Sequence, residues 1–185
     1  MYYVVKYSGP FGFIKPWTAV RDAGSGETYS QQFLTPSIIE GIRQKLEVEG
    51  IARHKLTYAG INLQQEVVEA KAWSRKGKTY IKEKSILKRG IMLNPTLYLA
   101  FINNDDAGKA LKQHICLCRN EDILFPKGEI LEFLEHDFDK LDGYELRFGR
   151  NEKSFLVGYN RFKENEPMFG WIEITGNPIQ KPVNE

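Results

Sequence analysis

A strongly basic stretch, residues 71–89, places the firmest constraint on how this chain can fold. It holds eight cations against one acid, Glu83, a local charge of +7, while the whole chain carries only +2. Gly77 is free to adopt a positive φ, so residues 75–78 are typical of a hairpin tip. The stretch therefore predicts a basic β-ribbon, and a solvated charged loop is the alternative.

Two aromatic residues, Trp73 and Tyr80, are interleaved with these cations. Cations can follow phosphates while flat rings stack on bases, so such a ribbon suits a single nucleic-acid strand. Either ring could equally pack at the root of the hairpin. The residues of the stretch predicted to bind RNA are Lys71, Trp73, Arg75, Lys76, Lys78, Tyr80, Lys82, Lys84, Lys88 and Arg89.

The length and composition predict an ordinary globular protein. The 185 residues suffice for one domain or one domain with a small appendage, and 42% are hydrophobic and 27% charged. No apolar run reaches the roughly 18 residues that a membrane span requires. The first residues are typical of a strand and not of a signal peptide. We therefore expect a cytoplasmic protein with no membrane partner.

The two cysteines, Cys116 and Cys118, are too close in sequence for an ordinary structural disulfide. His114 precedes them at the same alternate spacing, so on a strand all three side chains would share a face. A metal site needs three or four ligands, and no second group of Cys or His residues is present. We expect ordinary packing here, with no metal and no cofactor.

Charge is segregated along the chain. Residues 121–145 contain nine acids and only two cations, Lys127 and Lys140, a local charge of −7. The nearly neutral net charge of the chain is therefore expected to combine a basic ribbon with an acidic helix face. This pattern fits a protein that grips a nucleic acid at one place and presents other surfaces to other partners.

The clearest helix start is Thr35 followed by Pro36, an N-cap residue and a proline at the first helical position. An apolar stripe follows, and Gly50 is predicted to stop the helix. Gly41 is unfavourable within it by up to about 1 kcal/mol; close approach of a ligand or a tight helix–sheet contact would each explain it. The exposed N–H groups from Thr35 to Ser37 could receive a phosphate.

The remaining pattern predicts an α+β chain. A first strand, the helix, two strands extended into the ribbon, a buried strand, a helix and a final strand give the order β-α-β-β-α-β of a ferredoxin-like domain. We assign it to residues 1–160, with the ribbon as a thumb at about 68–90, and a short strand and tail to 161–185. Strands are expected at 2–7, 53–59, 65–73, 79–86, 96–102, 144–148, 154–159 and 169–174, further helices at about 105–114 and 129–141, connections at 91–95 and 124–128, and a frayed tail at 177–185.

Three stretches together resemble a known family. The first contains Gly9-Pro10-Phe11 and then Thr35-Pro36-Ser37 with an aliphatic helix containing Gly41. The second leads from Asn62 through the basic hairpin to the apolar strand at 96–102. The third is Leu146-Arg147-Phe148-Gly149-Arg150-Asn151-Glu152. In this order they resemble family five of the CRISPR-associated proteins, in the RAMP superfamily. For that family the chain is short, and we expect no elaborate C-terminal domain.

This resemblance implies a role in antiviral defence. Members of the family cap the 5′ handle of the guide RNA in a Cascade-like effector complex, and they contact the backbone subunit of family seven and the large subunit. Target DNA is then an indirect partner. The basic stretch falls at the thumb, Thr35, Ser37 and Gly41 fall at the helix that faces the handle, and Arg150 falls at the turn beside it. The acidic residues at 129–142 would lie away from the RNA.

Two other functions stay open. One branch of the family cleaves its own precursor RNA without a metal, which requires an acid, a base and a cation. Tyr29, His54, His114 and the ribbon lysines are the candidates here, each isolated in sequence. No nucleotide-binding loop or nucleophile motif is present. We therefore predict a non-catalytic RNA-binding subunit, with a precursor-RNA endoribonuclease and a small unrelated interaction domain as the alternatives.

Overall fold

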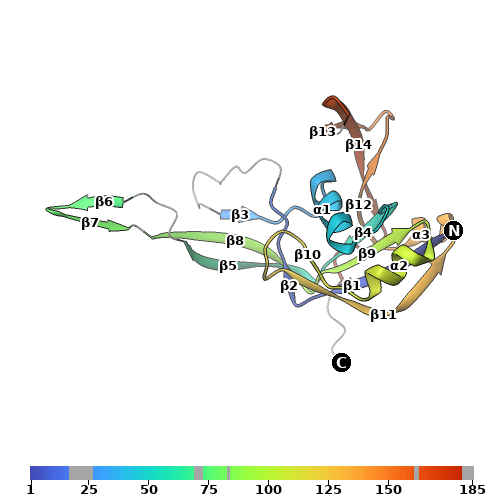
Figure 1. The fold of residues 1–185 in the computed structure, drawn as a ribbon, viewed down its shortest axis with the longest axis horizontal. Coiled ribbons are helices and arrows are strands. Elements are labelled where there is room, and N and C mark those ends of the chain that lie inside the picture. The colour runs from blue at the N-terminus through green and yellow to red at the C-terminus, as the bar shows by residue number, and fades with distance from the viewer. Residues whose placement is uncertain (17–26, 69–72, 83, 161–162, 181–185) are drawn as a thin grey trace.

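The computed structural model describes residues 1–16, 27–68, 73–82, 84–160 and 163–180. They form an α+β fold dominated by an antiparallel sheet, which confirms the predicted class. Figure 1 shows a body built on this sheet and a long ribbon that projects from it. No helix in the described residues is long and apolar enough to cross a membrane.

Eight strands form the main sheet, and every neighbouring pair is antiparallel. The predicted apolar strand at 96–102 is confirmed as a central, largely buried strand. In spatial order the strands are β10 (Ile115–Cys116), β11 (Ile123–Phe133), β1 (Tyr2–Ser8), β9 (Thr96–Phe101), β4 (Arg53–Thr57), β12 (Gly143–Phe148), β14 (Glu166–Thr175) and β13 (Phe155–Asn160).

Helix α1 (Pro36–Leu46) begins as predicted. The Thr35 side chain accepts a hydrogen bond from the backbone N–H of Ile38, and Pro36 is the first helical residue. The predicted stop at Gly50 is wrong. Glu47 closes the helix instead, with a left-handed φ of 56° and a backbone N–H that faces the carbonyls of Arg43 and Gln44.

Helix α2 (Asn104–Leu111) differs from its prediction at both ends. Its N-cap is Asn103, whose side chain accepts from the N–H of Asp106, so the helix begins one residue earlier than predicted. The helix ends well before the expected residue 114. Ile115 and Cys116 then form strand β10.

The predicted helix at 129–141 is wrong. Residues 123–133 form strand β11, which pairs with β1, and only the short helix α3 (Glu135–Lys140) follows. The expected break at 124–128 is also part of β11, where Gly128 has a φ of 72° beside an irregularity in the β1 register. Pairing with β1 outweighs the helical spacing of the apolar residues, and Leu134 of the expected buried stripe is 52% exposed.

The ribbon is longer than predicted. Its strands β5 (Gly60–Val68) and β8 (Ser85–Leu93) pair over nine residues, so the expected connection at 91–95 is largely strand. The tip is a separate pair, β6 (Trp73–Lys76) and β7 (Thr79–Lys82). Both ribbon strands continue from central strands, because only two residues separate β4 from β5 and β8 from β9. Two short strands, β2 (Phe11–Gly12) and β3 (Glu27–Tyr29), flank β8 at the root.

The main core lies between one face of the sheet and the helices α1 and α2. Helix α1 contributes Ile42 and Leu46, and α2 contributes Ala107 and Ala110. Tyr7 of β1 reaches across the core, and its hydroxyl donates to the Ala110 carbonyl. A smaller apolar cluster around Phe138 of α3 covers the other face.

An ion cluster, called the buried ion cluster because Arg53, Lys55 and Glu145 are buried, also includes the half-exposed Asp139 and joins β4 to α3 and β12. Arg53 Nε and Nη2 donate to the two Glu145 carboxylate oxygens at 2.8 and 2.6 Å, and Nη1 donates to Asp139 at 2.6 Å. Lys55 is fully buried, donates to the Thr175 hydroxyl at 2.6 Å, and lies 4.0 Å from Glu145.

The pKa values of the two cations in this cluster shift in opposite directions. Burial disfavours the charge of Arg53, but hydrogen bonds to Glu145 and Asp139 outweigh burial and raise the pKa of the guanidinium. Burial lowers the pKa of Lys55, although the Glu145 charge opposes this. The predicted acidic helix face at 129–142 is therefore wrong, because residues 123–133 form a strand and Asp139 is bound to Arg53.

The C-terminal region is part of the same sheet. Strand β14 lies between β12 and β13, so pairing crosses the predicted division at residues 160 and 161. The expected frayed tail from residue 177 is wrong as far as Gln180, because Tyr58 donates to the Pro178 carbonyl and accepts from the Gln180 N–H. Residues 181–185 lie outside the described residues.

Candidate nucleic-acid interface

The ribbon tip forms the tight hairpin that the sequence predicts. Lys76 pairs with Thr79, and Gly77 and Lys78 form the two-residue turn between them. Gly77 has a φ of 63° and occupies the first turn position, where a type II′ turn requires a positive φ. This turn projects the surrounding cations into solvent at the far end of the molecule (Figure 1).

The strand register divides the tip into two faces. Trp73 pairs with Lys82, and Arg75 pairs with Tyr80. Because side chains alternate along a strand and paired residues share a face, these four lie on one side of the ribbon. We call this set, Trp73, Arg75, Tyr80 and Lys82, the aromatic–cation face. The opposite face carries Ser74, Lys76, Thr79 and Ile81.

Both aromatic rings are open to solvent. Trp73 is 63% exposed and Tyr80 is 61% exposed, so neither packs against the root of the hairpin. They occupy diagonal positions across the strand pair, which places their backbone positions about 7–8 Å apart. Two rings at that spacing can hold one flat base between them, since stacked bases repeat every 3.4 Å or so.

Several tip cations have no acidic partner among the described residues. Arg75 donates Nε to the Gly77 carbonyl at 3.0 Å, which leaves the rest of its guanidinium accessible. Lys76, Lys78 and Lys84 are exposed, and no acid among the described residues pairs with them. Lys82 is exposed on the aromatic–cation face. Lys71 lies outside the described residues.

Lys88 and Arg89, the two cations of the basic stretch nearest the body, are engaged in internal contacts. Arg89 Nε donates to Glu66 at 2.7 Å, and its guanidinium lies 5.2 Å from the centre of the Phe13 ring. Arg119 covers the same ring at 5.5 Å and pairs with Asp122 at 2.6 Å. Lys88 is 3.7 Å from Glu27. These contacts fasten the ribbon to the body, so its root is held while its tip extends.

The start of α1 and the Arg150 turn meet in one pocket of about 710 Å³. Pro36, Ile39 and Glu40 line one side, and Arg150 and Phe169 line the other. The Arg150 guanidinium stacks 4.1 Å from the Phe169 ring centre. Hydrogen bonds from Arg43 and then Gln44 lower the pKa of Glu40 to about 2, so this pocket also contains a fixed anion.

The three helix residues predicted to bind RNA, Thr35, Ser37 and Gly41, differ from one another in their surroundings. Thr35 is buried and its hydroxyl is used as the cap, 3.0 Å from the exposed Ser37 hydroxyl. Gly41 lies on another side of α1, where a Cβ built on it would meet nothing within 4 Å. The tight helix–sheet contact that we considered for Gly41 is therefore wrong.

The candidate cleavage residues are dispersed. His54 is 1% exposed, accepts a hydrogen bond from the Leu146 N–H, and has its pKa lowered to about 3, first by burial and then by the charges of Arg53 and Lys55. It cannot reach an RNA strand in this fold. Tyr29 is half exposed at the ribbon root, where its hydroxyl donates to Glu27. His114 is exposed beside β10.

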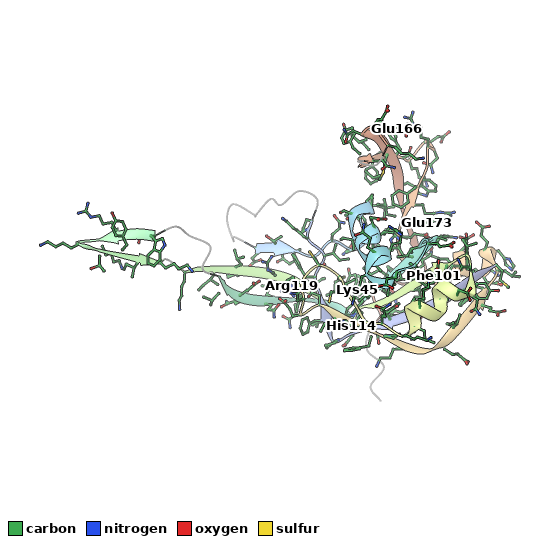
Figure 2. The ribbon with its side chains drawn as sticks, in the orientation of Figure 1. Lys45, Phe101, His114, Arg119, Glu166 and Glu173 are labelled. Carbon is green, nitrogen blue, oxygen red and sulfur yellow. The ribbon has the colours of Figure 1, made fainter. Side chains whose placement is uncertain are left out.

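The sequence alone did not identify two residues on the body side of the ribbon, Lys45 and Arg119. Figure 2 shows Arg119 at the ribbon root, with Lys45 and His114 beyond it toward the body. Lys45 follows Gly41 by four residues in α1, so the two residues share one helix face. This spacing could have predicted that Lys45 lies beside Gly41. Arg119 had no comparable signal, because its contact with Gln64 joins residues 55 positions apart.

Cys116 and Cys118 are both free thiols, and burial raises the pKa of the Cys116 thiol. Within the described ranges, no three His, Cys, Asp or Glu side chains gather as metal ligands. The chain matches no protein-family model and no curated protein.

Proposed function

We propose that the ribbon binds a single strand of RNA, and that the protein holds the 5′ handle of a guide RNA in a CRISPR effector complex. The observation that carries the proposal is the aromatic–cation face, where two exposed rings alternate with two cations on one side of a projecting hairpin. Stacking on aromatic rings and cationic contacts to phosphates are the two means by which proteins hold single strands.

In the proposed complex one unpaired base stacks between Trp73 and Tyr80. Arg75 and Lys82 occupy the other two corners of the same face, and they bind the phosphates on either side of that base. A duplex would not fit this arrangement, because its bases are already stacked on one another. The face therefore selects an unpaired strand with little dependence on base identity.

The topology of the body supports a ferredoxin-like core as part of this proposal. The adjacent strands β11, β1, β9 and β4 are joined through β1–α1–β4 and β9–α2–β11, and the ribbon is inserted between β4 and β9. This connectivity supports the proposed β-α-β-β-α-β order. The other four strands of the sheet then extend that core on its two sides.

The identity of the RNA and the partners rests on the sequence resemblance. We propose that the handle lies along the ribbon, that the backbone subunit of family seven and the large subunit bind other surfaces, and that target DNA is met only through the complex. The exposed Ser37 at the start of α1 and Arg150 form a second contact with the RNA. We place the complex in the cytoplasm and expect the protein to need no cofactor.

The proposal is tested by charge reversal at the tip. RNA affinity is measured by fluorescence anisotropy over a series of salt concentrations. The variant changes Arg75, Lys76, Lys78 and Lys82 to Glu. Each lost phosphate contact on a single strand reduces the slope of log affinity against log salt by about 0.7. We expect a total reduction of about 3 and a large loss of affinity.

A matched control separates this effect from net charge. It changes four exposed lysines away from the ribbon, Lys112, Lys127, Lys140 and Lys153, to Glu. This control should retain most of the slope. Equal losses in the two variants would refute an interface confined to the ribbon. No loss in either variant would favour an interaction domain that does not bind RNA.

The identity of the RNA is tested by purifying the protein from cells that carry a CRISPR array. We expect it to retain a short RNA of uniform 5′ end, and the tip variant to lose it. Incubation of pure protein with repeat RNA in EDTA addresses the endoribonuclease. A defined cut that disappears in His114→Ala would replace the binding-only proposal.

A further inference from the structure

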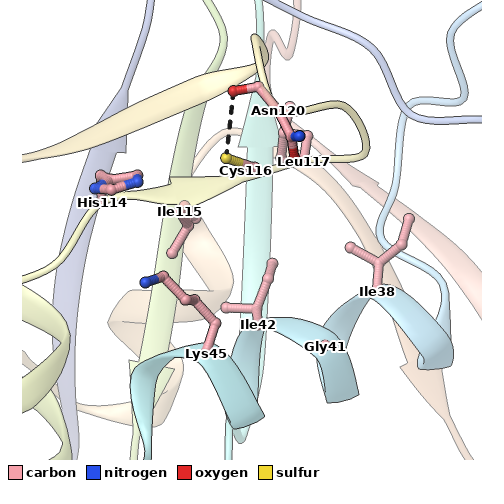
Figure 3. A pocket seen from close by; sticks show the side chains of 9 residues that line it. All are labelled: Ile38, Gly41, Ile42, Lys45, His114, Ile115, Cys116, Leu117 and Asn120. Carbon is pink, nitrogen blue, oxygen red and sulfur yellow. Dashed lines mark hydrogen bonds between the residues drawn. The ribbon is translucent and has the colours of Figure 1, made fainter.

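A second pocket lies between α1 and β10, and it differs in character from the ribbon. It has a volume of about 430 Å³, which is within the range of small-ligand sites. Figure 3 shows Ile42 of α1 and Ile115 of β10 on facing sides, with Leu117 beyond them. These three side chains are at most 3% exposed, so the base of the pocket is apolar and fixed by the core.

Gly41 keeps the helix side of this pocket open. A Cβ at that position would meet nothing within 4 Å, so packing does not require glycine there. Glycine inside a helix costs about 1 kcal/mol relative to alanine. Its effect is to leave the helix backbone uncovered where it borders the pocket, which makes room for a flat group (Figure 3).

The rim combines one lysine with other hydrogen-bonding side chains. Lys45 is exposed, and no acid among the described residues pairs with it. His114 and Asn120 lie on the opposite rim, and the Cys116 thiol donates to the Asn120 carbonyl at 3.7 Å. An apolar base, a polar rim and one cation suit a heteroaromatic ring that carries one negative group.

The pocket adjoins the proposed RNA interface. Asn120 follows Arg119, whose guanidinium donates to Gln64 of the ribbon strand β5 at 3.1 Å. Figure 2 shows Arg119 at the ribbon root, with Lys45 and His114 beyond it. Trp73 follows Gln64 by nine residues, and a chain of that length spans at most about 32 Å, so about ten stacked nucleotides would reach from the aromatic–cation face to the ribbon root.

We propose that this pocket receives one unpaired base of the bound RNA, with Lys45 on an adjacent phosphate; this rests on the proposed function of the ribbon. The base lies over Ile42 and Ile115 beside Gly41, and Asn120 and His114 meet its polar edge. The tip then holds the backbone with little sequence preference, while the pocket reads one nucleotide beyond the ribbon root.

The test follows the δ1-methyl NMR signals of Ile38, Ile42 and Ile115 during titration with an RNA of about ten nucleotides, a length set by the ribbon. An aromatic base placed against these methyl groups shifts their signals. Gly41→Leu fills the opening, and Gly108→Leu is the matched control, because Gly108 lies in α2 where an added Cβ also meets nothing within 4 Å.

We expect RNA to shift the three methyl signals in the wild type and in Gly108→Leu, but not in Gly41→Leu. Gly41→Leu should also weaken RNA binding by about tenfold, the order expected for one base contact, without changing its salt slope. Lys45→Gln should reduce that slope by about 0.7. RNA that binds through the ribbon while the methyl signals stay still would overturn the pocket and leave the proposed function intact.

If the ribbon does not bind RNA, titration with single nucleotides tests the pocket independently. The four nucleoside monophosphates and inorganic phosphate are titrated separately. Shifts caused by a nucleotide and not by phosphate would support a nucleotide pocket even if the ribbon has another function. Equal shifts with inorganic phosphate would show a simple anion site, and no shift with any nucleotide under those conditions would overturn the pocket.

Discussion

The buried ion cluster and the ribbon tip use similar residues for opposite purposes. In the cluster, Arg53 and Lys55 lie on a central strand, and every strong donor has a carboxylate or hydroxyl partner. At the tip, Lys76 and Lys78 lie on a projecting hairpin and have no acidic partner among the described residues. Both regions also contain an aromatic ring, and Arg53 lies 4.9 Å from the centre of Phe138.

The difference shows that the location of the acids decides what a cation does. Desolvation makes an unpaired charge in the interior costly, so the cluster binds its cations to fixed anions. Water makes the same charges inexpensive at the tip, where they remain available for a ligand. Four predictions test this contrast, from the largest expected effect to the smallest.

Glu145→Gln should cause the largest loss of stability. It removes the charge that two Arg53 nitrogens contact and leaves Arg53 and Lys55 short of a buried partner. Breaking one side of a buried pair costs about 3–5 kcal/mol, which urea unfolding would measure. Asp137→Asn, which disrupts an exposed pair with Lys140, is the control and should have little effect. Similar results for both variants would refute the contrast.

Acid should destabilise the fold through His54. Burial lowers the pKa of His54 to about 3 from 6.5, so between these values the unfolded chain binds a proton that the folded chain does not. The free energy of unfolding therefore falls as the pH falls, by about 2 kcal/mol from pH 6.5 to 4.5. His54→Gln should flatten the urea-unfolding series over this range. An unchanged slope in that variant would assign the effect to other groups.

Trp73→Ala should weaken RNA binding without changing stability. Losing one stacking partner costs about 1–3 kcal/mol of binding, or about five- to 150-fold in affinity. Trp73→Phe should restore most of it because a ring remains. Anisotropy and urea unfolding on the same samples separate binding from folding, and a loss of stability in Trp73→Ala would mean that the ring packs internally.

Lys76→Gln should produce the smallest change. The residue lies on the opposite face from Trp73 and Tyr80, so its only expected role is a phosphate contact. The salt slope should fall by about 0.7 or less, and the unfolding midpoint in urea should not move. A larger effect than that of Trp73→Ala would place the RNA on the other face of the ribbon.

Local signals explain which elements the sequence could predict. Gly77 between two basic strands is sufficient for a hairpin, and Thr35 with Pro36 is sufficient for a helix start, because each signal acts within a few residues. The main error, at residues 129–141, arose where a helical spacing of apolar residues competed with pairing to the distant strand β1. Periodicity cannot anticipate such a partner.

The candidate sites also differ in whether local sequence signals could predict them. The tip residues follow one another along the hairpin, so their shared face could be anticipated from alternation alone. The pocket beside Gly41 is formed by α1 and β10, and the partners Arg53 and Glu145 are 92 positions apart. Neither arrangement has a local signature, so both require the folded chain.

The position of the ribbon within the chain has a consequence for how such a protein can change. Because the ribbon is inserted between β4 and β9, its strands can be lengthened or shortened without altering the core. Removing two residues from each strand would shorten its reach by about 6.6 Å and keep every remaining side chain on its present face. Removing one from each would turn the tip over. Reach can therefore vary only in paired steps if the tip is to keep its orientation.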